Sequence, residues 1–160
     1  MAISAKIKTN SNKIRKKFRQ LGSAIPRIID KGLKQAGFQL IDIIRTKTQK
    51  GKDFNDRKFA PYSDSYLKRL QSEGRPTAVD LIYDNGMMGA LTPSMVKKTG
   101  KHKISIAFSR KEEIDKAFFN QVTNEPKREF FGFNKRTEKI ISKQFNNFVF
   151  KELRKMKIWV

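Results

Sequence analysis

Residues 26–49 read PRIIDKGLKQAGFQLIDIIRTKTQ, and this segment determines which faces the rest of the chain must cover. Apolar residues recur in it every three or four positions, which predicts a long amphipathic helix. The apolar face consists of Ile25, Ile28, Ile29, Leu33, Ala36, Leu40, Ile43 and Ile44. Gly32 and Gly37 each weaken a helix by about 1 kcal/mol relative to alanine. They mark either close packing of another element or a tolerated cost, and the sequence leaves both interpretations open.

A shorter helix is expected on the N-terminal side, over residues 11–22. Ser11 or Asn12 can cap it, and one stripe at helical spacing holds Ile14, Phe18 and Leu21. Gly22 should end this helix. Pro26 should then stand in the first turn of the next helix, where its missing N–H has no cost.

A polar loop, QKGKDFNDRKFAP, follows over residues 49–61 and contains two aromatic residues, Phe54 and Phe59. Aromatic side chains in such a loop usually pack back on the protein body or contact a partner. A small helix should come next, opened by Ser63 as the cap and stopped by Gly74.

The periodicity then changes to that of strands. Residues 103–109 alternate Ile104, Ile106 and Phe108 with smaller or polar residues, which predicts a half-buried strand preceded by a turn at 98–101. Residues 78–83 are predicted as another short strand, before a loop rich in glycine and methionine. Residues 117–123 are a third candidate strand.

A final helix is expected over about residues 136–156, capped by Asn134 or Thr137. Its apolar stripe comprises Ile141, Phe145, Phe148, Val149, Leu153 and Met156. The chain ends in an apolar tip, 158–160, which suits either a docked tail or a partner contact. The pattern predicts a single α+β domain over residues 1–160, with N-terminal helices and a C-terminal helix packed on a small antiparallel sheet, and with a long loop.

Charge is the strongest global feature: 36 Lys and Arg face 15 Asp and Glu, a net charge of +21. Such a surface attracts polyanions such as DNA, although a lysine-rich genome would produce the same excess. No helix-turn-helix, zinc-finger or RNA-binding signature accompanies it, so we expect no sequence-specific readout. The cations best suited to lie near DNA are in the last helix: Lys139, Lys143, Lys151, Arg154 and Lys155.

Several classes of function are disfavoured by the composition. The chain has no Cys, which excludes disulfides and thiolate metal sites. No segment is long and apolar enough for a membrane span or a signal peptide, so we expect a soluble protein made in the cytoplasm, with no membrane partner. The single His, His102, is interpreted as a solvated turn residue. Carboxylates at Asp53, Asp56 and 112–115 stand among cations, which favours plain ion pairing over a metal nuclease. We therefore expect no enzyme, no metal and no cofactor.

One ordered set of short motifs resembles a known family. The set comprises Arg45-Thr46, Gly51-Lys52-Asp53-Phe54, RKFAPYS at 57–63, YLKR at 66–69, Asp80-Leu81-Ile82 with Gly86-Met87-Met88, and PKREFFG at 126–132. In this order, over about residues 40–150, the set resembles the phage virion morphogenesis family, which includes tail completion proteins. Residues 120–123 depart from that family's usual His-x-x-Gly, and Tyr62 replaces its usual Leu.

The resemblance implies a neck or tail-end subunit of a tailed bacteriophage virion, assembled in the host cytoplasm. Such a subunit would form a closed ring, six- or twelve-fold, and contact portal, tail-tube or other neck proteins. Candidate contacts between subunits are Phe54, Phe59, Met87, Met88, Arg128, Phe130 and Phe131. The segment 126–132 has a second interpretation, as a corner inside the domain that holds the last helix on the sheet. The alternative function is a non-specific nucleic-acid-binding protein.

Overall fold

One long helix, α1 (Ser11–Gln49), forms the axis of the fold in the computed structural model, which describes residues 11–156 and the side chains of 15–156. It has 39 residues and passes without a break through Gly22 and Pro26. The helix break predicted there is wrong. Pro26 has no N–H to donate to the carbonyl of Gly22, so the helix loses one backbone hydrogen bond there and still continues.

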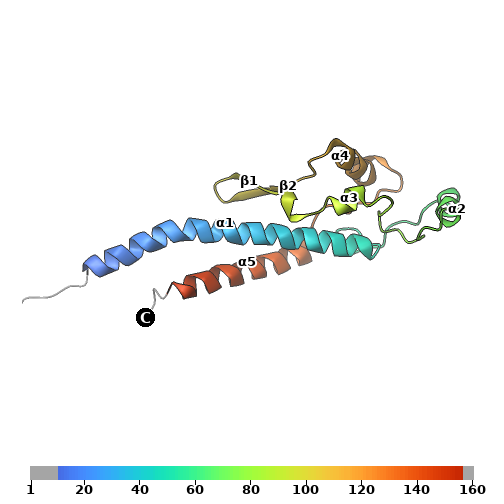
Figure 1. The fold of residues 1–160 in the computed structure, drawn as a ribbon. Coiled ribbons are helices and arrows are strands. Elements are labelled where there is room, and N and C mark those ends of the chain that lie inside the picture. The colour runs from blue at the N-terminus through green and yellow to red at the C-terminus, as the bar shows by residue number, and fades with distance from the viewer. Residues whose placement is uncertain (1–10, 157–160) are drawn as a thin grey trace, which may run out of the picture.

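The last helix, α5 (Lys135–Lys155), packs along α1 and runs in the opposite direction (Figure 1). Gly32 permits the close approach: a Cβ there would lie 2.9 Å from Cε2 of Phe145 and 3.1 Å from Cδ1 of Phe148. The predicted stripe of α5 is confirmed, since all six of its side chains are partly buried. The apolar tip at 158–160 lies outside the described residues.

A two-stranded antiparallel hairpin covers a second side of α1 (Figure 1). Its strands are β1 (Val96–Gly100) and β2 (Lys103–Ile106). A Cβ on Gly37 would lie 2.8 Å from Cγ1 of Val96 and 3.0 Å from Cδ1 of Ile104. Of the two interpretations of the α1 glycines, close packing therefore holds for both Gly32 and Gly37.

The predicted strands are confirmed only in part. Residues 103–106 form β2, but the turn lies at 101–102 and the partner strand is β1. Residues 78–83 are irregular, so the strand predicted there is wrong. Leu81 has a φ of +58°, and the Asp80 carboxylate accepts a hydrogen bond from the backbone N–H of Ile82, a local turn that prevents an extended conformation.

The third predicted strand, 117–123, is also wrong. It belongs to α4 (Lys111–Phe118) and to the π-helical turn η2 (Phe119–Thr123) that continues it. The amide of Gln121 accepts from the backbone N–H of Phe131 at 3.1 Å and donates to its carbonyl at 2.7 Å. A side chain thus makes the two hydrogen bonds that a neighbouring strand would otherwise make.

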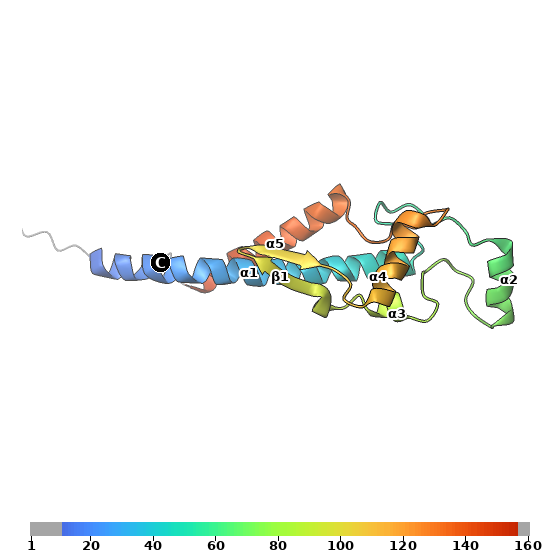
Figure 2. The same ribbon diagram turned by 90° about the horizontal axis from the view of Figure 1, so that it is seen from above.

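The core lies where the C-terminal half of α1 meets the hairpin, the single turn α3 (Gly86–Gly89) and the 3-10 turn η1 (Pro93–Met95). Its buried members are Ile41, Ile44, Phe59, Met87, Met88, Leu91, Met95, Val96 and Phe130. The small helix α2 (Asp64–Ser72) projects at the far end of the molecule (Figure 2), with Ser63 as its cap as predicted. The fold is α+β, as the sequence predicts. Among residues 11–156, no helix combines the length and apolar character needed to cross a bilayer.

Candidate functional site

The loop between α1 and α2 packs back on the protein. Phe59 donates its backbone N–H to the carbonyl of Gly51 at 2.8 Å, and its ring enters the core. Phe54 lies against Gly132: a Cβ on Gly132 would be 3.1 Å from Cγ of Phe54. Both loop aromatics are therefore held by contacts within the chain.

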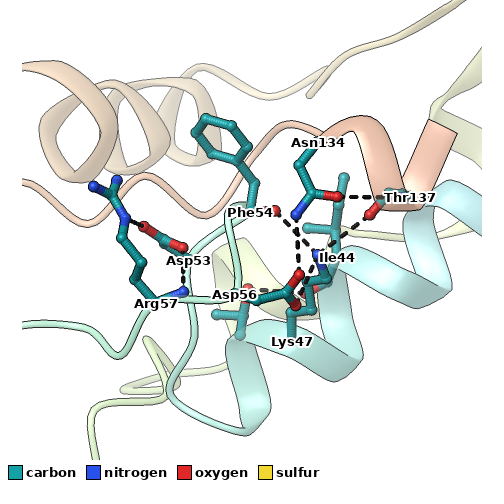
Figure 3. Close-up of polar contacts among 9 residues, drawn as sticks. Ile44, Lys47, Asp53, Phe54, Asp56, Arg57, Asn134 and Thr137 are labelled. Atoms are coloured by element: carbon teal, nitrogen blue, oxygen red, sulfur yellow. Dashed lines mark hydrogen bonds and ion pairs between the residues drawn. The ribbon is translucent and has the colours of Figure 1, made fainter.

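A polar network ties this loop to the start of α5, as Figure 3 shows. The Lys47 ammonium donates to the Phe54 carbonyl at 3.0 Å and to Thr137 Oγ1 at 3.2 Å, and it forms an ion pair with Asp56 Oδ1 at 3.0 Å. The other Asp56 oxygen accepts from the Asn134 amide at 3.0 Å. Asn134 in turn caps α5 by accepting the backbone N–H of Thr137 at 2.9 Å.

The two loop carboxylates that could have held a metal are both engaged with cations. The hydrogen bonds from Lys47 and then Asn134 hold the pKa of the Asp56 carboxyl below its ordinary value. Asp53, which is buried, accepts the backbone N–H of Arg57 at 2.8 Å and its Nε at 2.9 Å. These contacts fix the loop conformation and leave both carboxylates tied to neighbouring cations.

The segment 126–132 forms a corner between the loop and α5. Arg128 is buried, and its Nη2 donates to the carbonyls of Ala60 at 3.4 Å and Pro61 at 3.2 Å. Its guanidinium lies over the Tyr62 ring, 4.9 Å from the centroid. Phe130 is 1% exposed, with Phe131 packed at 6.1 Å between centroids. These contacts support the interpretation of this segment as a corner inside the domain.

The structure places the seven candidate subunit contacts inside the chain rather than on one outer face. Five of them are buried: Phe59, Met87, Met88, Arg128 and Phe130. The other two, Phe54 and Phe131, are half-buried. Intrachain packing therefore explains why these residue types stand at these positions.

The five candidate DNA-proximal cations are all exposed on α5: Lys139, Lys143, Lys151, Arg154 and Lys155. Lys155 forms an ion pair with Glu152. The others have no ion-pair partner among the described residues. Phosphate groups could reach this side of the molecule directly, because α1 packs on the other side of α5.

An exposed apolar surface that the sequence reasoning missed runs along α4 and η2. Its four large side chains are each about half exposed: Ile114, Phe118 (54%), Phe119 (51%) and Val122. Two exposed acids lie on the same side of α4: Glu112 comes before Ile114, and Asp115 is one turn before Phe118 and Phe119. We call these six residues the α4 face. The i, i+4, i+8 spacing of Ile114, Phe118 and Val122 is the sequence signal that would have indicated it.

His102 and one surface cleft are two further places where chemistry could occur. His102 is half-buried and pairs with Asp30 of α1 at 3.1 Å, so its interpretation as a simply solvated residue needs correction. A cleft of about 690 Å³ lies beside Tyr62, Tyr83 and Arg128, and its ionic pair is Lys116 with Asp84. No cluster of three or more potential metal-ligating side chains occurs in the part of the chain that the structure describes.

No protein-family model, curated protein or solved structure matches this chain.

Proposed function

We propose that this chain is a structural subunit of the neck or tail end of a tailed bacteriophage, which assembles with copies of itself into a ring. The observation that carries the proposal is the α4 face. Four large apolar side chains stand out from one short helical segment of a highly charged chain. Contiguous apolar surface of this kind is typical of protein–protein contacts rather than of a free monomer's surface.

The geometry of the motif residues supports the same function. The residues that carry the family resemblance, such as Arg128 and Phe130, hold the loop, the core and α5 together. A ring subunit needs such a rigid body, because small errors in the angle between neighbours prevent closure. The contacts between copies are then made by the α4 face, while the buried aromatics and methionines maintain its position.

The exposed cations of α5 have a role in this proposal. A ring at the head–tail junction surrounds the path of the genome, and lysines facing that path attract phosphates without reading sequence. Lys139, Lys143 and Lys151 are exposed on one helix and suit this role. The attraction should be weak for a single copy and should fall as the salt concentration rises.

Electron microscopy of a phage carrying a stop codon in this gene alone tests the function. We expect DNA-filled heads beside separate or unfinished tails, with joined particles restored when the wild-type gene is supplied in trans. Infectious, fully joined particles without the protein would refute the proposal.

The second candidate function, non-specific binding of nucleic acid by the free chain, is supported by the same exposed cations of α5. It predicts tight binding of duplex DNA by the monomer, with a steep dependence on salt, and no self-association. Sedimentation of the purified chain with and without DNA separates the two functions, since a ring subunit associates without DNA.

A further inference from the structure

A second exposed apolar surface lies on α1. The N-terminal part of α1 projects past the hairpin and α4 (Figures 1 and 2). Phe18 is 66% exposed there, and Ile25, two helical turns further, is 39% exposed. Gly22 lies between them on the same side of the helix, and no atom of the described residues outside the local helix backbone lies within 4 Å of where its Cβ would be. The helix surface therefore has a hollow flanked by two apolar side chains.

Two cations complete this surface. Arg15 and Arg19 are exposed on the same side of α1, and neither has an ion-pair partner among the described residues. Residues 15, 18, 19, 22 and 25 fall within about a third of the helix circumference at 100° per residue. We call these five residues the α1 face.

The α1 face and the α4 face are complementary in charge, and both present exposed apolar side chains. The α4 face presents adjacent aromatic rings, Phe118 and Phe119, whose centroids are 6.4 Å apart. The α1 face presents a hollow at a glycine, where a ring could lie close to the helix backbone. Each face also has two exposed charges beside its apolar residues, acidic on α4 and basic on α1.

Charge also determines which surfaces of two copies can come into contact. At a net charge of +21, two copies repel each other at long range, and salt screens this only beyond about 8 Å at physiological ionic strength. A contact between copies therefore favours places where opposite charges meet. Glu112 and Asp115 supply acid on the α4 face, whereas residues 15–27 of α1 contain basic residues and no acid.

We propose that the α4 face of one copy docks on the α1 face of a second copy, with an aromatic ring over Gly22 and with Glu112 and Asp115 beside Arg15 and Arg19. Because the two faces differ, the contact is heterologous, and each copy keeps one free face for the next. Repetition closes into a ring when the rotation between neighbours divides a full turn. The inference rests on the proposed ring function and names the surfaces that would build it.

Charge reversal in the full-length chain tests the pairing. One variant carries Glu112→Lys and Asp115→Lys, and a second carries Arg15→Glu and Arg19→Glu. Each should stay monomeric at concentrations where sedimentation velocity shows the wild type assembled, because like charges then meet. The chain that combines all four changes restores opposite charges, and it should regain wild-type assembly.

Matched controls separate the contact from general effects of charge. The first control carries Asp64→Lys and Asp42→Lys, which make the same charge change at exposed positions. Asp64 lies in the first turn of a helix, as Glu112 does, and Asp42 lies in the middle of a helix, as Asp115 does. Lys16→Glu with Arg27→Glu makes the opposite change on a different side of α1, at exposed positions. Both control chains should assemble as the wild type does.

Three results would overturn the inference: a wild-type chain that stays monomeric up to its solubility limit, a four-fold variant that stays monomeric, or controls that lose assembly equally. If both charge-reversal variants assemble into rings as the wild type does, this pairing is refuted but the ring function is not. Joined, infectious phage in the stop-codon experiment would refute the function itself.

Discussion

Three glycines of α1 show that the surroundings of a glycine determine its effect on packing and stability. Gly32 and Gly37 stand where the side chains of α5 and of the hairpin approach the helix backbone within about van der Waals contact. Gly22 has open space around it. All three carry the same intrinsic helix penalty of about 1 kcal/mol, so only packing distinguishes them.

Alanine at Gly37 and at Gly22 should therefore have opposite effects on stability. Gly22→Ala should raise the free energy of unfolding by up to about 1 kcal/mol, since it adds helix propensity in open space. Gly37→Ala gains the same propensity but forces a methyl group against Val96, so it should be less stable than Gly22→Ala by about 1–3 kcal/mol. Urea unfolding followed by circular dichroism measures both, and equal stabilities would contradict the packing described for Gly37.

The carboxyl of Asp56 should make the stability of the fold depend on acid. Its pKa is lowered in the folded chain by Lys47 and Asn134, so its ionised form stabilises the fold in full above the unfolded pKa of about 3.9. That contribution is lost as the pH falls through the folded pKa. Asp56→Asn should lower stability at neutral pH and lose less stability than the wild type between about pH 5 and pH 3.

Urea titrations at a series of pH values measure this difference. Asp42→Asn is the matched control, because Asp42 is exposed on α1 and makes no ion pair among the described residues. An Asp56→Asn chain that lost as much stability in acid as the wild type would contradict the network drawn in Figure 3.

Among the secondary-structure elements, the long terminal helices and α2 were predictable, whereas α4 and most of the predicted strands were not. The segments 26–49, 63–72 and 136–156 show their 3.6-residue period locally, and local capping residues such as Ser63 and Asn134 mark where two of them begin. The wrong prediction at Gly22 and Pro26 came from local breaking signals. These were overridden because a helix packed along part of its length extends at little cost per residue.

The strand errors arose because pairing depends on distant residues. Residues 117–123 have the aromatic and β-branched composition of a strand, yet Gln121 alone supplies the hydrogen bonds to Phe131. This error also concealed the α4 face, since a strand period places Phe118 and Phe119 on opposite sides. Likewise, the burial of Met87 and Arg128 depends on long-range packing that composition does not reveal.

The two best-defined helix caps offer a test at the level of whole elements. Asn134→Ala removes the cap of α5 and also the hydrogen bond to Asp56. Ser63→Ala removes a long capping bond of 3.4 Å and an exposed 3.2 Å bond to Ser65, both at the start of α2. We expect Asn134→Ala to cost about 1–2 kcal/mol of unfolding free energy and Ser63→Ala about 0.5 kcal/mol. If urea unfolding shows comparable losses of unfolding free energy for the two variants, the hydrogen bond between Asn134 and Asp56 does not contribute to stability.

Across the whole molecule, the α1 face, the α4 face and the exposed lysines of α5 lie on different elements. The α1 and α4 faces combine apolar groups with opposite charges, which suits contacts between copies, while the outer side of α5 has lysines without described partners. A ring built from heterologous contacts presents one side of every subunit to its channel. If that side is α5, DNA attraction and assembly depend on different residues and can be separated by mutation.

Replacement of Lys139, Lys143 and Lys151 by Gln should then weaken binding of duplex DNA and leave assembly intact. Each phosphate contact contributes about 0.9 to the slope of log K against log salt concentration, so the slope should become shallower by up to about 2.7. The control replaces Lys97, Lys101 and Lys103, three exposed lysines in and around the hairpin, with the same loss of charge. Fluorescence anisotropy over a salt series measures both slopes. If the two triple variants flatten the slope equally, DNA responds to the net charge of the chain, and α5 has no special position on the DNA path.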